Sequence, residues 1–193
     1  MLAYESKQMY QTQALSRKHV MLITVIVLAL AIMSVPAFAK VGGKSPGEAT
    51  IYEIEKGSED FETLTFALEA TGLDAALDNG GQFTVFAPTD DAFAALEAAN
   101  PGITEYLVNN PDVLESVLLY HVTEGRRWSN SVVNKNNPKD VEMLSGGYIT
   151  VTPEGTIMDM NSLGLVSPDA TIVAPNVNAS NGVIHVIDDV LIP

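Results

Sequence analysis

Histidines and paired acids are the residues of this sequence whose types could support acid–base or metal chemistry. His121 and His185 each lie among apolar residues, and the 193-residue chain has three histidines and no cysteine. Zinc sites usually take three or four nitrogen, sulfur or oxygen ligands, so this pair of histidines falls short of one. We therefore expect both to be half-buried and hydrogen-bonded to the backbone, and we predict no metal site.

The acidic pairs Asp90-Asp91 and Asp188-Asp189 also have a structural explanation. Neighbouring side chains on a helix do not face each other, and neighbours on a strand point to opposite faces, so neither pair converges on one substrate atom. Asp90 and Asp91 follow Thr89 at the start of a predicted helix, where acids stabilise the helix dipole. The pattern G-x-S-x-G occurs at residues 43–47, at the end of the predicted tether, and no strand-to-helix turn is predicted there to expose a serine nucleophile. We predict neither a catalytic residue nor a cofactor.

Arg126, Arg127 and Trp128 point instead to an interface. They begin a segment rich in Ser and Asn that extends to Asp140. Arginine and tryptophan are common anchors of binding surfaces. From residue 40 onward the chain has seven Lys/Arg and 23 Asp/Glu, so this cluster differs in charge from its surroundings. We predict that the three residues contact a partner.

The composition restricts the class of function. The whole chain has a net charge of −14, and beyond residue 40 only Arg126 and Arg127 are adjacent cations. Nucleic-acid binding depends on clustered Lys and Arg, so nucleic acid is not expected as a partner. The lack of cysteine excludes a disulfide framework. Hydrophobic residues make up 47% of the chain, which suffices for one packed domain.

The first 39 residues have the pattern of an export signal. Arg17, Lys18 and His19 precede an apolar run from residue 20 to 33, and Ala37-Phe38-Ala39 fits a signal-peptidase site. We expect cleavage between Ala39 and Lys40, followed by secretion or retention in the periplasm or at the cell surface. A retained signal anchor is the alternative, although the apolar run is shorter than the roughly 20 residues that span a bilayer.

The remaining chain divides into a tether, residues 40–46, and one domain, residues 47–193, without internal repeats. Helices are predicted early: at 49–56, from Ser58 to Gly72, at 73–77, after Thr89, and from Asn110-Pro111 into Tyr120-His121-Val122. Strands are predicted at 83–87, 141–144, 148–152, 156–158, 171–177 and 183–187. Helices that cluster before most of the strands indicate an α+β fold.

Three segments in this order resemble the fasciclin (FAS1) family. They are residues 83–93 (FTVFAPTDDAF), residues 118–122 (LLYHV) and residues 181–193 (NGVIHVIDDVLIP). The resemblance covers nearly all of the chain beyond residue 47. It implies a fasciclin-like wedge of β-sandwich-like sheets with helices packed around them, and adhesion outside the cell or at its surface.

The same resemblance nominates Tyr120 and His121 for contact with a partner. The alternative is that these two residues lock the end of a helix to the sheet. Animal members that bind integrins carry an Asp-Ile pair just before the closing segment. Asn176-Val177 stands there in this chain, so we do not expect integrin binding.

Together these observations predict a monomeric extracytoplasmic module that adheres to a protein or matrix partner at the cell surface and is not an enzyme. Tyr120, His121, Arg126, Arg127 and Trp128 are its predicted contact residues. The membrane would be reached only through an uncleaved N-terminal segment. Two alternatives stay open: a carrier of a small apolar or lipid ligand between sheet and helices, and an extracytoplasmic hydrolase.

Overall fold

The structure is a computed structural model that describes residues 47–79, 81–159, 163–165 and 167–193. The predicted export signal (residues 1–39) and tether (residues 40–46) lie outside the described residues. None of the helices in the described part of the chain has both the length and the hydropathy to cross a membrane.

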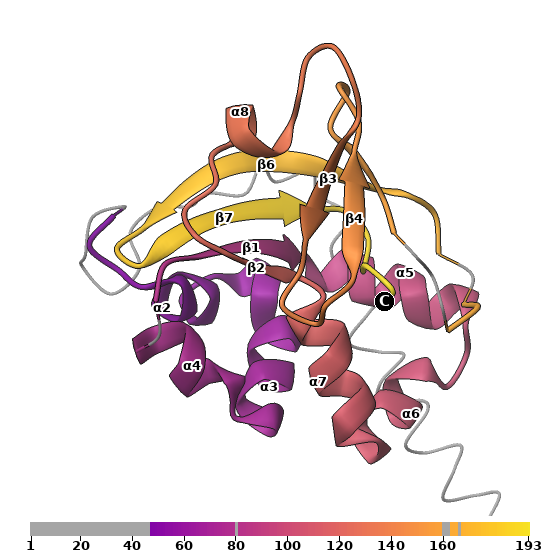
Figure 1. Cartoon of the computed structure of the whole chain (residues 1–193). Helices are drawn as coiled ribbons and strands as arrows, with labels where there is room; N and C mark the ends of the chain where they lie inside the picture. Colours follow the sequence, from indigo (N-terminus) through magenta and orange to yellow (C-terminus); the bar gives the residue numbers. More distant parts are fainter. Residues whose placement is uncertain (1–46, 80, 160–162, 166) are drawn as a thin grey trace, which may run out of the picture. The chain divides into compact units, whose positions relative to one another are not determined.

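Helices and strands form two groups on the described chain (Figure 1). The helices are α2 (Ile51–Lys56), the 3-10 turn η1 (Glu59–Phe61), α3 (Glu62–Thr71), α4 (Leu73–Asn79), α5 (Asp90–Ala99), α6 (Ile103–Asn109), α7 (Pro111–Leu119) and α8 (Ser129–Val132). The strands are β1 (Phe83–Pro88), β2 (Val122–Glu124), β3 (Lys139–Glu142), β4 (Tyr148–Val151), β5 (Thr156–Met158), β6 (Ala170–Ala179) and β7 (Gly182–Ile187). In Figure 1, α2, α3, α4, α6 and α7 lie below β1 and β7, whereas α8 lies above them.

Local signals explain where the predicted helices begin and end. Thr50 and Glu53 form a capping box at the start of α2, and Gly72 ends α3 in the left-handed conformation, with φ of 74°. Thr89 caps α5 as predicted. Asp90 also caps a second helix, because its carboxylate accepts hydrogen bonds from the backbone of Glu62 and Thr63 at the start of α3. This acid therefore joins two helices, which confirms a structural role.

The strands form one mixed sheet of seven strands in the order β2-β1-β7-β6-β5-β4-β3. β1 and β7 pair in parallel, and the other neighbours pair antiparallel. Gly182 begins β7 at a point where a Cβ atom would collide with the carbonyl oxygen of Phe83 and the side chain of Ile51. This pairing therefore requires a glycine.

The two outer strands of the sheet approach each other. The backbone N–H of Leu144, just after β3, donates to the carbonyl oxygen of Val122 in β2 at 2.8 Å. The hydroxyl of Thr123 in β2 donates to the carbonyl oxygen of Glu142 in β3 at 2.7 Å. The sheet therefore wraps into a near-barrel, which is the form that the predicted wedge takes, and the mixed α+β class is confirmed.

Three short elements were not predicted from the sequence: β2, α6 and α8. Val122 continues the apolar stripe of α7, so the sequence suggested that the helix runs through it. In the fold, pairing with β1 holds residues 122–124 as a strand. α6 and α8 are short, with 7 and 4 residues, so their periodicity is weak.

The interior consists of two clusters of buried side chains. One lies between the helices and the sheet and includes Phe61, Leu64 and Ile184. The other joins Phe86 to Tyr120, Ile149, Ile157 and Leu191 across the strands. Each of the three family-like segments contributes buried side chains, so all three are part of one folded body.

Glu55 is an exception within this apolar interior. Its side chain is fully buried, and neither carboxylate oxygen has a hydrogen-bond partner in the described residues. Burial raises its pKa from 4.5 to about 8, because a charge is unfavourable in apolar surroundings. The carboxyl group is therefore mostly protonated at neutral pH.

We predict that Glu55→Gln stabilises the fold increasingly as the pH rises from 4.5 to 8. The unfolded chain releases this proton above about pH 4.5, whereas the folded chain keeps it up to about pH 8, so ionisation favours unfolding across that range. The variant has no carboxyl group to ionise here. Its free energy of unfolding, relative to that of the wild type, should therefore rise by up to about 1.4 kcal/mol per pH unit. Urea unfolding of both proteins at several pH values measures the difference, and a difference independent of pH would contradict the prediction.

Candidate functional site

Tyr120 and His121 lie inside the protein. Tyr120 ends α7 with 0% of its surface exposed, and its hydroxyl donates to the carbonyl oxygen of Tyr148 in β4 at 2.7 Å. His121 is 2% exposed. Neither side chain is accessible to a partner in this conformation. Direct contact with a partner through Tyr120 or His121 is not observed and remains a prediction.

His121 connects three parts of the fold. Its Nε2 accepts a hydrogen bond from the backbone N–H of Leu191 at 2.9 Å, so its Nδ1 carries the proton and donates to the carbonyl oxygen of Val117 at 2.7 Å. Its own carbonyl oxygen accepts from the N–H of Phe86 in β1 at 2.9 Å. Burial lowers the pKa of His121 to about 4. The geometry supports the alternative role, in which Tyr120 and His121 lock the helix end to the sheet.

Arg126 fastens the chain between β2 and α8 to the hairpin of β6 and β7. Its guanidinium donates to the amide oxygen of Asn178 at 2.7 Å and to the carbonyl oxygens of Ala179 and Ser180, both at 2.9 Å. Its Nε donates to the side chain of Gln82 at 2.9 Å. A planar guanidinium can satisfy several acceptors at once, so Arg126 acts as a clamp.

A second group of buried polar atoms holds the neighbouring backbone. The hydroxyl of Thr84 in β1 donates to the carbonyl oxygen of Gly125 at 2.7 Å and accepts from the N–H of Arg127 at 2.8 Å. His185 in β7 is fully buried, and its Nε2 bonds to the carbonyl oxygen of Arg127 at 2.9 Å. Both histidines are thus bonded to backbone as predicted, although each is more deeply buried than expected.

Asn176 completes this set of contacts. Its side-chain oxygen accepts from the N–H of Ser129 at 2.7 Å, and its side-chain nitrogen donates to the hydroxyl of Ser129 at 2.8 Å. It lies at a bulge of β6 with a positive φ of 66°, a conformation that asparagine tolerates better than most residues. Sequence reasoning noted this position but missed its role at the start of α8.

The contacts define what we term the α8 segment, residues 125–139, from the end of β2 to the start of β3. Its first residues are fixed to β1, β6 and β7, and Val132 is fully buried. Trp128, in contrast, keeps 39% of its surface exposed. The structure therefore brings the predicted Arg126, Arg127 and Trp128 onto one rigid support, apart from the buried Tyr120 and His121.

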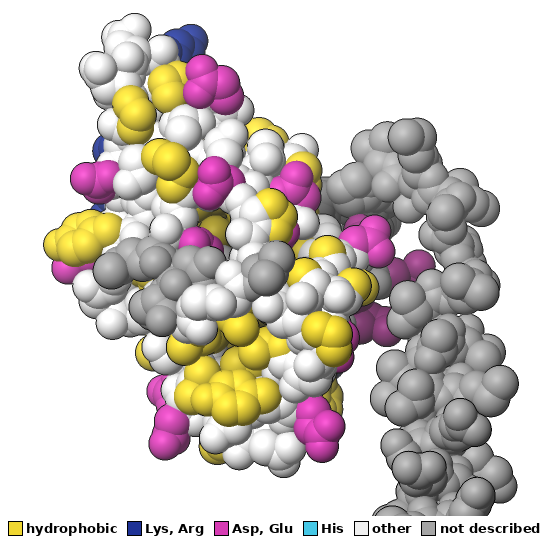
Figure 2. Space-filling view, turned by 90° about the vertical axis from the view of Figure 1, so that its right-hand side faces the viewer, with side chains coloured by type: hydrophobic (Ala, Val, Ile, Leu, Met, Phe, Trp, Pro, Cys, Tyr) yellow, Lys and Arg dark blue, Asp and Glu magenta, His cyan; other side chains and the backbone are white. Residues whose placement is uncertain are grey.

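Charge is distributed unevenly between this segment and the helices. The α8 segment has four Lys/Arg and no Asp/Glu, whereas residues 51–119 have 14 Asp/Glu and one cation, Lys56. On the face in Figure 2, acidic side chains recur from top to bottom, while Lys and Arg show only in the upper part. Because Figure 2 is turned only about the vertical axis, its upper part is the end of the molecule where Figure 1 shows α8.

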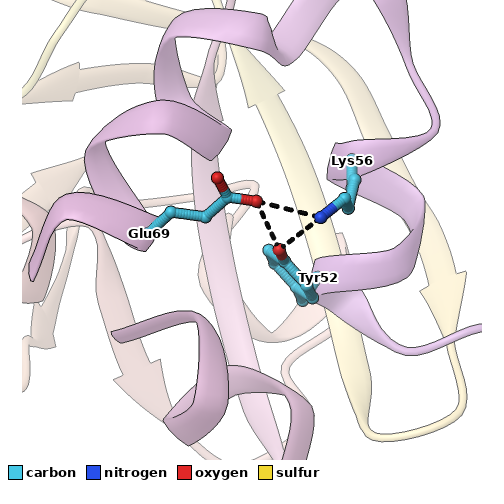
Figure 3. Close-up of polar contacts among 3 residues, drawn as sticks. All are labelled: Tyr52, Lys56 and Glu69. Atoms are coloured by element: carbon cyan, nitrogen blue, oxygen red, sulfur yellow. Dashed lines mark hydrogen bonds and ion pairs between the residues drawn. The ribbon is translucent and has the colours of Figure 1, made fainter. Parts of the chain in front are cut away.

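Lys56 is occupied within the helical layer (Figure 3). Its ammonium donates to the hydroxyl of Tyr52 at 3.0 Å and to the carboxylate of Glu69 at 2.9 Å, while the Tyr52 hydroxyl donates to the same oxygen at 2.7 Å. The bond to Tyr52 and the bond and charge of Glu69 raise the pKa of Lys56. These exposed contacts tie α2 to α3. Lys56 is the one cation of residues 51–119, and it is already paired, so this part of the chain has no free cation to bind an anionic partner.

Comparison with known proteins gives consistent matches. The Fasciclin domain model matches residues 59–193. Protein sll1483 of Synechocystis sp. is 41% identical over 146 residues, which cover 75% of this chain and 73% of that protein. Protein sll1735 of the same organism is 37% identical over 142 residues, covering 74% and 96%. Transforming growth factor-beta-induced protein ig-h3 of Sus scrofa is 32% identical over 143 residues, which cover 74% of this chain and 19% of that protein.

The fold also occurs among solved structures. An example is a FAS1 domain pair from the insect cell adhesion molecule fasciclin I, with a TM-score of 0.63 at 18% identity. The match covers 75% of this chain and 51% of that chain. At this level of identity the likeness concerns the fold alone.

We predict that Arg126→Ala lowers the free energy of unfolding by about 1–3 kcal/mol, because several part-buried acceptors lose their donor. Arg126→Lys should recover little of this loss, since one ammonium cannot reach acceptors spread over Gln82 and the β6–β7 turn. Arg127→Ala is the matched control. Within the described part of the chain, the Arg127 side chain forms a single hydrogen bond, from Nε to the carbonyl oxygen of Glu124. Equal losses in Arg126→Ala and Arg127→Ala, measured by urea unfolding, would refute the clamp.

We predict that His121→Gln weakens the pH dependence of stability in weakly acidic solution. The unfolded chain binds a proton at this histidine below about pH 6.5, whereas the folded chain binds it only near pH 4, so stability falls as the pH drops through that interval. For each unit by which the pH falls, the free energy of unfolding of the wild type should drop by up to about 1.4 kcal/mol more than that of the variant. The variant should be less stable at pH 7, because glutamine does not reproduce both backbone hydrogen bonds. If the free energy of unfolding depends on pH in the same way in both proteins, His121 is not held neutral in the fold and the prediction is wrong.

Proposed function

The chain belongs to the fasciclin family, and on this premise we propose that it is an extracytoplasmic module that binds a protein or matrix partner at the cell surface. It acts as a monomer, without a cofactor and without catalysis. The fasciclin domain family is associated with cell adhesion, which supports an adhesive role. The basic and apolar pattern of residues 17–39 supports export of the domain.

The observation that carries the proposal is an exposed tryptophan on a rigid support. Trp128 is 39% exposed, while the residues on either side of it are fixed by Thr84, Asn176 and His185. A surface that is ordered before binding loses less conformational entropy when the partner arrives. Tryptophan and arginine are also the residues most often found to dominate binding energy. The neighbouring Arg127 supplies such an arginine.

The geometry of the histidines supports a non-catalytic role. In His121 and in His185 both ring nitrogens are within hydrogen-bond distance of backbone groups. Burial lowers the pKa of each. A histidine that acts as a general base needs a nitrogen within reach of its substrate. Both rings are instead engaged in holding strands and loops together.

We predict that the double variant Arg127→Ala/Trp128→Ala binds cells of the producing organism at least about tenfold more weakly than the wild type, because truncating anchor residues typically costs more than 1 kcal/mol each. Arg126 is left in place so that the clamp persists. Labelled protein added to washed cells measures the affinity.

Tyr106→Ala is the matched control. Tyr106 is 50% exposed on α6, so its loss removes an exposed aromatic side chain from a different surface. Its binding to cells should equal that of the wild type. Undiminished binding of the double variant, with a thermal transition like that of the wild type, would rule out this surface.

A further inference from the structure

A groove of about 450 Å³ lies beside α8. It is lined by Asn130 of α8, by Val133, Asn134 and Lys135 of the following loop, and by Lys139 at the start of β3. Its volume lies in the range of small-ligand sites. The lining combines one aliphatic side chain with two amides and two ammonium groups, so it suits a polar ligand that carries negative charge.

The ammonium of Lys135 is available to such a ligand. Lys139 donates to the carbonyl oxygen of Ser131, and this bond holds the start of β3 against α8. Lys135 is exposed and forms no hydrogen bond or ion pair with any described residue. No Asp or Glu occurs between residues 125 and 139 to neutralise it. In a chain that has 23 acidic residues from residue 40 onward, this segment carries a local excess of positive charge.

The other side chains of the segment favour a sugar over a peptide. The exposed amide of Asn130 offers both donors and an acceptor, which is what neighbouring hydroxyl groups require. Asn134 uses its side-chain oxygen for the N–H of Asn136, at 3.1 Å, and this leaves its amide nitrogen to donate. Trp128, immediately before α8, is 39% exposed, and an indole ring suits the apolar face of a sugar. An acidic peptide would use the same ammonium and amides but has no sugar face to stack on this ring.

We propose that the groove beside α8 binds an acidic polysaccharide, with the carboxylate of a uronic acid paired with Lys135 and sugar hydroxyls bonded to Asn130 and Asn134. This inference rests on the proposed function, because it names the class of matrix partner. The positive charge of the α8 segment attracts the ligand, whereas the acidic residues of the helices repel it. Binding therefore weakens as salt screens the Lys135 pair.

Trigalacturonate titrated into the purified full-length protein tests the proposal. Trp128 is the single tryptophan of the chain, so its fluorescence reports on this segment, and calorimetry gives the affinity independently. We expect saturable binding that weakens at high salt, and weaker binding of neutral galactotriose. Lys135→Gln should reduce the affinity at least about tenfold. Lys56→Gln, which removes the same charge from the helical layer, should leave it unchanged.

Three results would overturn the inference: no saturable binding of trigalacturonate, equal losses in Lys135→Gln and Lys56→Gln, or equally tight binding of poly-L-glutamate, which would indicate an acidic peptide site. The outcome is separable from that of the cell-binding experiment. Loss of cell binding in Arg127→Ala/Trp128→Ala without trigalacturonate binding would uphold the interaction module and reject the sugar. Trigalacturonate binding with undiminished cell binding would uphold the groove and reject Trp128 as the cell-surface anchor.

Discussion

The parallel pairing of β1 with β7 is the constraint on which the remaining structure depends. These strands come from opposite ends of the domain, and Gly182 allows them to meet because any side chain there would strike Phe83 and Ile51. Once they are paired, Thr84 on β1 and His185 on β7 lie where both can bond the backbone around Arg127. The helices pack on the other side through Phe61, Leu64 and their neighbours. The rigid α8 segment is thus a consequence of a pairing that is distant from it in sequence.

Polar groups inside this domain are used to join elements. Tyr120, His121, His185 and Asn176 each bond to backbone atoms of another element, and a buried polar group that is satisfied in this way specifies one arrangement of the chain. Glu55 differs, since it is buried without a partner in the described residues and keeps its proton. The positions that the family resemblance emphasises are therefore mainly those that build the fold, whereas the exposed Trp128 and Lys135 belong to the α8 segment.

Sequence reasoning identified the elements whose signals are local. The helix start after Ser58, the cap at Thr89, the stop at Gly72 and most strand segments are encoded within a few residues, and the structure has them. β2 was missed because Val122 fits a helical stripe equally well, and only its pairing with β1 decides its conformation. The roles of Arg126 and Asn176 could not be foreseen, because their partners lie about 50 residues away in the chain. Arg126 was predicted to contact a partner because arginine is common at interfaces. The residue type does not show whether the guanidinium already forms hydrogen bonds within the fold.

The contact between β2 and β3 has a consequence for aggregation. Unpaired strand edges are templates on which other chains can add, and this is a common route to aggregation. Here the last residues of one outer strand bond to the other through Val122, Thr123 and Leu144. The two margins of the sheet thereby satisfy some of each other's backbone groups. Fewer of these groups are left to pair with a strand of a neighbouring molecule.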